Sequence, residues 1–241
     1  EFGFTTLESY KIILTSILGI TNKEIIHEFD KIVYELDKSV YEDNLYYKNI
    51  NLKCISSNKW KFEYKSYKPY EAFVFNDLKC INDKLYPSIG YFKDEYKYPC
   101  VLENDREWML ITPNEIETMK KPISEATGNV LTYGLGLGYY AYMVSMKDNV
   151  ESVTIVEKDK EIIDLFNEYI LPQFKNKSKI KIINDDAFNY FKKDIYYDYV
   201  FVDIWHDPSD GIDLYLKFKS LEKDNIKYSY WIEDTLKCYI E

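Results

Sequence analysis

Three glycines at alternate positions are the clearest chemical feature of the chain. Gly134, Gly136 and Gly138 directly follow the apolar run 130–133, and an apolar stretch with helical spacing comes after them. Because glycine has no Cβ, such a turn lets the backbone bend tightly and approach a ligand closely. A strand, a glycine turn and a helix in this order predict a corner that binds a nucleotide or nucleoside.

Three acidic residues follow later apolar runs, where the ligand crevice of a parallel sheet should lie. Glu157 comes 19 residues after Gly138, where a carboxylate can accept both hydroxyls of a ribose. Asp186 suits the exocyclic amine of an adenine, and Ala187 beside it offers an apolar wall and a backbone N–H. Asp203 would lie beside the glycine turn, at the reacting group. The plainer alternative for each acid is a helix N-cap.

The glycines alone do not identify the cofactor. Gly136-x-Gly138-x-x-Ala141 also satisfies the dinucleotide fingerprint, so NAD is an alternative. Crowded carboxylates repel a pyrophosphate, whereas they attract the sulfonium of S-adenosylmethionine. The acids therefore favour S-adenosylmethionine as the cofactor.

His206 follows Asp203 by three residues and is the second candidate for catalysis. An imidazole there could act as a general base near neutral pH. The alternative is a loop histidine with Trp205 packed beside it. Trp205 itself either stacks on an acceptor ring or closes the pocket.

From residue 128 onward, strand-like and helix-like patterns alternate. Such alternation predicts an α/β fold, a doubly wound Rossmann-like parallel sheet with helices on both faces. The expected strands cover 130–133, 153–157, 180–184, 199–203 and 226–232. The expected helices cover 138–147, 159–170, 187–193 and 211–223.

A β-hairpin and a helix precede this alternation. Apolar runs on either side of Asn104 and Asp105 predict two strands within 99–112. Thr112 fits the N-cap of the next helix and Pro113 its first position, with Glu115 completing a capping box. This capping role already accounts for Glu115, although a ligand contact is an alternative.

The first 88 residues show no nucleotide motif. Two capping-box patterns, which begin at Thr5 and Thr21, predict a helical hairpin, and the second helix is expected to run to Leu36. Alternating aromatic and charged residues predict a strand near 60–65, and 70–81 is expected to return to helix. We expect two domains, a mostly helical N-terminal cap over 1–88 and a cofactor-binding domain over 89–241 that begins with the hairpin.

The composition restricts the partners. The net charge of −10 over 241 residues argues against an extensive nucleic-acid surface. Four cysteines without a Cys-x-x-Cys pair, beside only two histidines, predict no metal site and a reducing, cytoplasmic compartment. No apolar run approaches the ~20 residues that span a bilayer, so no membrane association is expected.

Residues 128 to about 210 resemble the class I S-adenosylmethionine-dependent methyltransferase fold, and within it most closely the spermidine synthase branch. Thr132 occupies a position before the glycines at which most methyltransferases carry an acidic residue. Spermidine synthases lack that acidic residue, as this chain does. Val153-Thr-Ile-Val-Glu-Lys-Asp159 resembles the second-strand Glu-x-Asp motif of that branch. Tyr197-Asp-Tyr-Val-Phe-Val-Asp203 resembles the strand that leads to its catalytic aspartate.

The resemblance implies a role for each matching position. The three glycines would hold the amino-acid part of the cofactor, Glu157 its ribose, and Asp186 with Ala187 its adenine. Asp203 would orient or deprotonate an acceptor amine. The chain departs from the branch after Asp203, where Ile-Trp-His-Asp-Pro stands in place of Ser-Ser-Asp-Pro, and it ends too soon for the usual sixth and seventh strands.

Three functions remain open on this basis. The first is a methyltransferase whose small-molecule acceptor, in one reading an amine, enters over 203–206 beneath the cap. The second is a spermidine synthase-like aminopropyltransferase. The third is a catalytically inactive nucleoside-binding or interaction module. A homo-oligomer is compatible with each of them.

Overall fold

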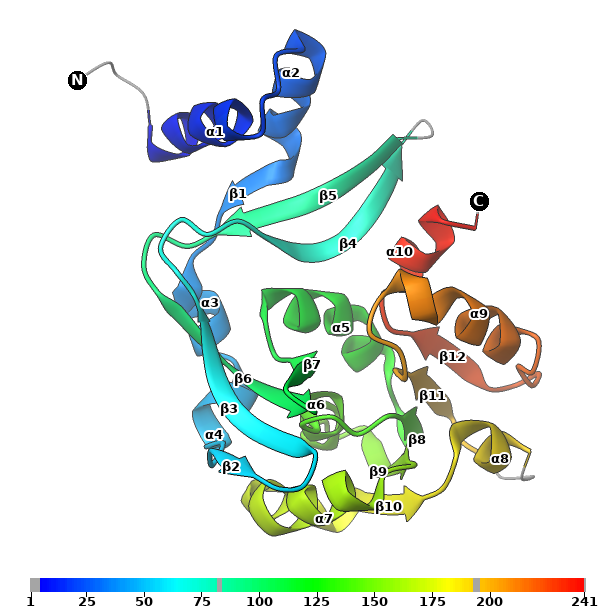
Figure 1. Ribbon diagram of the computed structural model, residues 1–241. Helices are drawn as coiled ribbons and strands as arrows, with labels where there is room; N and C mark the ends of the chain where they lie inside the picture. Colours follow the sequence, from blue (N-terminus) through cyan, green and yellow to red (C-terminus); the bar gives the residue numbers. More distant parts are fainter. Residues whose placement is uncertain (1–4, 82–83, 193–195, 241) are drawn as a thin grey trace.

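A five-stranded, all-parallel sheet forms the centre of the C-terminal half (Figure 1). The computed structural model describes residues 5–81, 84–192 and 196–240. The strand order is β10-β9-β8-β11-β12, so successive strands run outward in both directions from β8. The strand bounds are Gly128–Tyr133 for β8, Val150–Glu157 for β9, Ile180–Asn184 for β10, Tyr199–Val202 for β11 and Lys227–Tyr230 for β12. This order confirms the expected Rossmann-like, doubly wound sheet.

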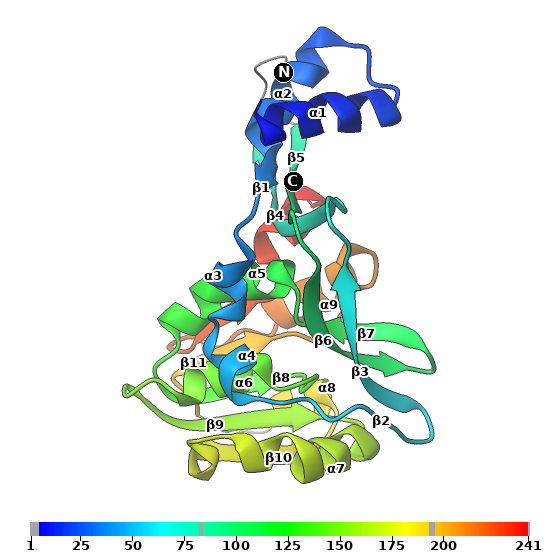
Figure 2. The same cartoon turned by 90° about the vertical axis from the view of Figure 1, so that its left-hand side faces the viewer.

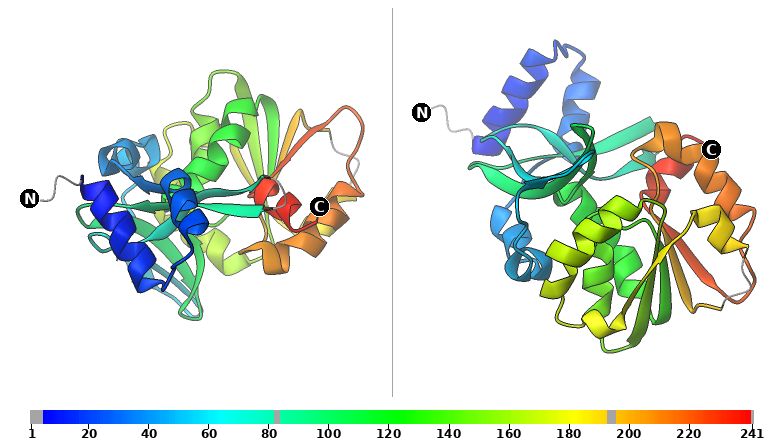
Figure 3. Two further views of the ribbon diagram at one scale, coloured as in Figure 1. Left: turned by 90° about the horizontal axis from the view of Figure 1, so that it is seen from above. Right: turned by 60° about the horizontal axis from the view of Figure 1, so that its bottom comes forward.

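Helices cover both faces of this sheet (Figure 3). In the described part of this half, the α-helices are α5 Pro113–Glu125, α6 Tyr139–Ser145, α7 Lys160–Tyr169, α8 Ala187–Phe191, α9 Pro208–Lys219 and α10 Glu233–Cys238. One buried cluster joins Val130 and Phe201 to residues of α6 and α7. Leu131 and Val202, one position further along each strand, join the opposite cluster with residues of α8 and α9. Burial on both sides accounts for the mostly apolar sequences of 130–133 and 199–202.

The strand register brings the predicted site residues to one edge of the sheet. Tyr133, the last residue of β8, pairs with Val156 on one side and with Val202 on the other. Gly134, Glu157 and Asp203 are the next residues along these three strands. Because the strands are parallel, all three emerge at the carboxyl edge, where ligands of such sheets bind.

The N-terminal half contains helices and two antiparallel-rich sheets. Its elements are α1 Thr6–Ile17, α2 Lys23–Ile32, β1 Val33–Glu35, α3 Lys38–Glu42, α4 Leu45–Asn49, β2 Ile55–Ser56, β3 Trp60–Tyr67, β4 Phe73–Ile81, β5 Lys84–Tyr91, β6 Tyr96–Glu103 and β7 Arg106–Leu110. One sheet has the order β1-β5-β4 and the other β2-β3-β6-β7. Figure 2 shows α1 and α2 at the end of the molecule far from the parallel sheet. Residue 88, the expected domain boundary, lies inside β5, and the division into domains stays a prediction.

Two expectations for this half are wrong. Residues 70–81 were expected to be helical, but 73–81 form β4, which pairs antiparallel with β5. Short apolar runs fit either period, and here the neighbouring strand decides. The second helix was expected to extend to Leu36, but it ends at Ile32 because the next three residues pair with β5. Over the described residues, no helix combines the length and apolar character needed to cross a bilayer.

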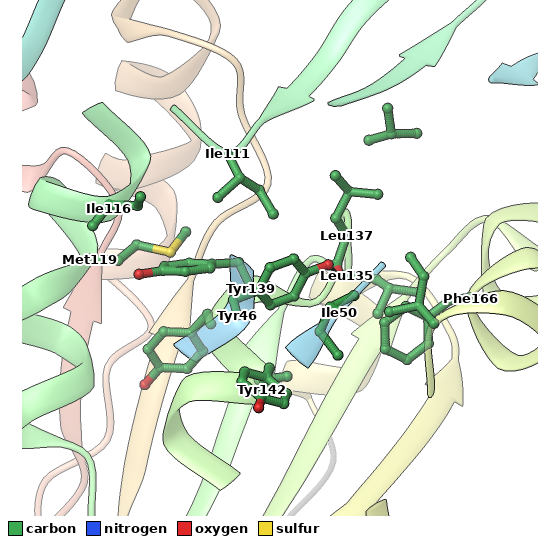
Figure 4. Packing of buried hydrophobic residues seen from close by; sticks show 14 of the residues in the cluster. Tyr46, Ile50, Ile111, Ile116, Met119, Leu135, Leu137, Tyr139, Tyr142 and Phe166 are labelled. Atoms are coloured by element: carbon green, nitrogen blue, oxygen red, sulfur yellow. Dashed lines mark hydrogen bonds between the residues drawn. The ribbon is translucent and has the colours of Figure 1, made fainter. Parts of the chain in front are cut away.

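Tyrosines connect the N-terminal half to the glycine turn (Figure 4). Tyr46 of α4 is buried against Tyr139 and Tyr142 of α6, with ring centroids 5.6 and 5.5 Å away. Its hydroxyl donates a hydrogen bond of 2.6 Å to the carbonyl oxygen of Leu137, within the glycine turn. Tyrosine accounts for 25 of the 241 residues, and some of these tyrosines therefore have a packing role.

Candidate functional site

A cavity of about 500 Å³ opens at the carboxyl edge of the parallel sheet. Its floor comes from the ends of β8, β9 and β11 and the start of α8, and residues of β7 and α5 form another wall. The residues predicted from the sequence are brought together here with one exception. Those that line the cavity are Gly134, Gly136, Glu157, Asp186, Ala187, Asp203 and His206.

The first two glycines shape the floor of the cavity through their backbone conformation. Gly134 has φ +97°, and a Cβ there would lie 1.9 Å from the carbonyl oxygen of Asp203. Gly136 has φ +49°, and its Cβ would lie 2.1 Å from the sulfur of Met109. Positive φ and close neighbours both exclude a side chain at these positions. The result is a cradle of backbone into which a ligand can settle.

Gly138 is the exception, because it is not among the residues that line the cavity. It precedes the first turn of α6 with φ +73°, and a Cβ there would lie 2.4 Å from the ring of Phe166. The third glycine therefore allows close packing between α6 and α7. A direct contact between Gly138 and a cofactor stays a prediction, and the location of Gly138 outside the cavity lining does not favour it.

Glu157 is held in place by backbone donors. Its Oε2 accepts the N–H of Leu135 at 3.2 Å, and its Oε1 accepts the N–H of Asp159 at 2.8 Å. Burial raises the pKa of Glu157, and these N–H donors oppose that rise. Each carboxylate oxygen keeps a further lone pair that can accept a hydroxyl, as ribose binding requires.

Asp186 is an N-cap, as the plainer alternative held, and it also lines the cavity. Its Oδ1 accepts the N–H groups of Phe188 and Asn189 at 3.0 and 3.1 Å. Both bonds use the same oxygen, so Oδ2 has no hydrogen bond among the described residues. Ala187 and Phe188 form an apolar wall next to it. A carboxylate oxygen beside an apolar wall suits an amine on an aromatic base.

Glu115 is predicted to cap α5, with a ligand contact as the alternative, and the structure places it in the cavity. Thr112 and Pro113 occupy the N-cap and first position of α5 as expected, but Thr112 makes no side-chain capping bond. The capping-box role of Glu115 is therefore wrong. Its side chain lines the cavity instead, is 5% exposed, and makes no hydrogen bond or ion pair to any described residue. A signal was present, since Glu115 shares a helix face with Thr118, Met119 and Pro122, all of them buried.

Asp203 and Glu115 form a pair of carboxyl groups in this cavity. The backbone N–H of Asp203 donates to the carbonyl of Tyr133 at 3.0 Å, which fixes its position after β11. Burial raises the pKa of Asp203 to about 7. Burial and the nearby Asp203 charge raise the pKa of Glu115 well above its ordinary value. Both shifts favour the protonated forms, so the pair holds its protons more tightly than exposed carboxyl groups do.

His206 lies in the same cavity with its ring held on two sides. Its Nδ1 is 2.8 Å from Oδ2 of Asp210, and its ring meets the ring of Trp108 edge-on at 4.4 Å. Among the described residues, no hydrogen bond joins His206 to Asp203. Trp205 is buried, and a Cβ on Gly211 would lie 2.9 Å from its ring. It therefore packs under α9 as well as lining the cavity.

The cavity carries an excess of acidic groups. Six carboxyl groups line it, whereas the basic side chains that line it are those of Lys158 and His206. One of the six, Glu107, is already paired with Lys65 at 2.6 Å. The remaining acids favour a ligand that carries positive charge. Within the described ranges, no group of three or more His, Cys, Asp or Glu side chains has the arrangement of a metal site.

A family model of known proteins matches this half of the chain. Residues 115–221, which include every predicted site residue, match the family model of the spermine/spermidine synthase domain. The match confirms the expected resemblance to that branch, in line with the Rossmann-like parallel sheet of this part of the chain. Among solved structures, the 23S rRNA methyltransferase ErmE is 19% identical, with a TM-score of 0.34. The aligned part covers 46% of this chain and 45% of that one, so the chain spans less than half of its length. No curated protein sequence matches.

Proposed function

We propose that this chain is an S-adenosylmethionine-dependent transferase that methylates a small-molecule acceptor. The register of β8, β9 and β11 supports the proposal best, because it gathers Gly134, Glu157 and Asp203 at one cavity. A cavity of about 500 Å³ is of the size that nucleoside ligands occupy. The glycine cradle fits the close approach of a ligand, and the acidic lining fits a sulfonium.

The residues present divide into a set for the cofactor and a set for the acceptor. Gly134 and Gly136 would hold the amino-acid part, Glu157 the ribose, and Asp186 with Ala187 the adenine. The cofactor supplies a methyl group activated by its sulfonium. The chain's own contribution is then to position an acceptor nucleophile against that methyl, which accounts for a large share of the rate of such reactions.

Asp203 would contact the acceptor nucleophile and orient it. With a pKa near neutrality it can accept a hydrogen bond from an ammonium or hydroxyl group, and Glu115 can donate or accept a second one. Trp108, Trp205 and Trp231 supply apolar walls. Such walls exclude water, which strengthens the polar contacts inside.

Aminopropyl transfer from the decarboxylated cofactor to an amine is the second candidate. The match of residues 115–221 to the spermine/spermidine synthase domain favours it. Glu115, which forms a buried carboxyl pair with Asp203, also suits a cationic acceptor.

Binding and turnover separate the candidates. By calorimetry, S-adenosylmethionine or its demethylated product should bind while NAD does not, and tight binding of NAD alone would contradict the proposal. Methylation of members of an acceptor library supports the first candidate. Turnover of decarboxylated cofactor with putrescine supports the second. Cofactor binding with no turnover of any acceptor indicates a binding module.

Two variants test the division of labour. Asp203→Asn should leave cofactor affinity unchanged and abolish transfer. Asp213→Asn, the same change at an exposed position of α9, is the matched control and should alter neither. Loss of cofactor binding in Asp203→Asn would place Asp203 in the cofactor set instead.

A further inference from the structure

The loop before α9 carries a second unit of titratable groups beside the cavity. His206 lines the cavity, and its side chain is 41% exposed. One ring nitrogen, Nδ1, is engaged by Oδ2 of Asp210 at 2.8 Å. The ring of Trp108, in T-shaped contact at 4.4 Å between centroids, restricts rotation of the imidazole. The ring is thus held in one orientation. No hydrogen bond to a described residue uses its other nitrogen, Nε2, which leaves that nitrogen for a ligand.

Asp210 is fixed by its own hydrogen bonds. Its Oδ1 accepts the backbone N–H groups of His206 at 3.0 Å and of Asp207 at 3.1 Å, and it closes a capping box at the start of α9. Partial burial opposes ionisation, but these bonds and the one from His206 hold the pKa of Asp210 below its usual range. An ionised carboxylate accepts hydrogen bonds only. Nδ1 therefore carries the proton, which leaves a lone pair on Nε2 of the neutral ring.

We propose that His206 and Asp210 form a catalytic dyad in which Nε2 of His206 takes the proton of the acceptor nucleophile. Asp210 is a positioning residue that sets the tautomer and the orientation of the ring. The inference rests on the proposed transfer function and deepens it. It implies an acceptor whose attacking atom bears a proton, such as an ammonium nitrogen or a hydroxyl oxygen.

The transfer step balances with this assignment. Nε2 takes a proton from the nucleophile, the electron pair freed by this forms a bond to the transferred carbon, and the bond from that carbon to sulfur breaks. Its electron pair returns to sulfur, so the sulfonium donor leaves as a neutral thioether. The proton of the nucleophile goes to Nε2 and then to solvent from the exposed side of the ring. Asp203 remains the group that orients the nucleophile.

The tautomer is measured first, without any need for activity. The chain has two histidines, and a His27→Gln variant identifies the signals of His206 by elimination. Nitrogen-15 shifts of the neutral ring should show Nδ1 protonated in the wild-type chain. In Asp210→Asn the amide can donate to Nδ1, so the protonated nitrogen should change to Nε2. A wild-type ring with the proton on Nε2 would overturn the proposal.

Kinetics test the catalytic role. With an acceptor that wild type turns over, Asp210→Asn and His206→Gln should each lower kcat by about 10²- to 10⁴-fold with little change in KM. The double variant should be no slower than the slower single one, because the two act as a unit. Asp210→Glu should recover part of the rate, and added imidazole should partly rescue His206→Ala. A purely structural role predicts neither recovery.

The possible failures are distinguishable. Wild-type rates in His206→Gln would overturn the dyad and leave the proposed transfer intact. Binding of the cofactor without turnover of any acceptor by wild type would overturn both. Thermal unfolding of each variant, compared with Asp213→Asn, separates loss of the α9 cap from loss of the base.

Discussion

The raised pKa of Asp203 makes the stability of the fold depend on pH in a defined direction. The unfolded chain ionises this carboxyl near 3.8, whereas the folded chain keeps the proton to about 7. Between these values the folded state binds more protons. The contribution of Asp203 to stability is therefore complete below the lower value and is lost as pH rises through the upper one.

The magnitude follows from the separation of the two pKa values. About three pH units at about 1.4 kcal/mol each give at most about 4 kcal/mol over the full range. Between pH 5.5 and 8.5 the stability changes only over the roughly 1.5 units below the folded-state pKa, so about 2 kcal/mol of unfolding free energy should be lost. An asparagine at this position has no proton to lose and should escape this decline.

The comparison is cleanest where the neighbouring carboxyl cannot titrate. Urea unfolding of Glu115→Gln and of Glu115→Gln with Asp203→Asn should be measured at pH 5.5 and 8.5. All other groups are common to both chains, so the difference in unfolding free energy isolates Asp203. That difference should shift by about 2 kcal/mol in favour of the asparagine chain at the higher pH. A difference that is the same at both pH values would refute the reasoning, because Asp203 would then titrate as an exposed carboxyl.

Three further outcomes are expected. Gly134→Ala should destabilise the fold by more than about 3 kcal/mol, because the new Cβ would clash with backbone at a position that also has a positive φ. The control is Gly19→Ala, which has φ +67° but open space around the Cβ and should cost about 1 kcal/mol. Equal melting temperatures of the two variants would contradict this prediction. Lys147→Met should cost about 2 kcal/mol in urea unfolding, since the ammonium donates to three carbonyls at the end of α5. Asp186→Ala should weaken cofactor binding by about 1–3 kcal/mol in calorimetry, and an unchanged affinity would remove Asp186 from the site.

The parallel sheet could be predicted because its signals are local. The strands of this sheet are rich in apolar residues, and the turns between them carry glycine or an N-cap such as Asp159 or Asp186. Once the order of strands is known, the register alone places Glu157 and Asp203 together. The N-terminal half lacks such signals. Residues 73–81 are a strand only because β5 is beside them.

The carboxyl pair and the dyad could not be predicted in the same way. Glu115 and Asp203 are 88 residues apart in sequence, and only the packing of α5 over the sheet edge brings both to the cavity. A glutamate at the third position of a helix suits either a capping box or a buried ligand contact, so the sequence alone favours the capping box, which is the commoner role. Asp210 was hidden for the same reason. It closes a cap and also holds an imidazole.

The contact between Gly134 and the backbone of Asp203 has a consequence for how binding could be observed. A Cβ at Gly134 would lie 1.9 Å from the Asp203 carbonyl oxygen, so the glycine turn cannot move toward β11 without displacing it. Trp205 is two residues further along, buried, with no hydrogen-bond partner for its indole N–H among the described residues. A ligand that shifts the turn should therefore change the environment of this indole. The intrinsic fluorescence of Trp205, which lies in the segment expected to meet the acceptor, would then report whether a cofactor occupies the glycine turn.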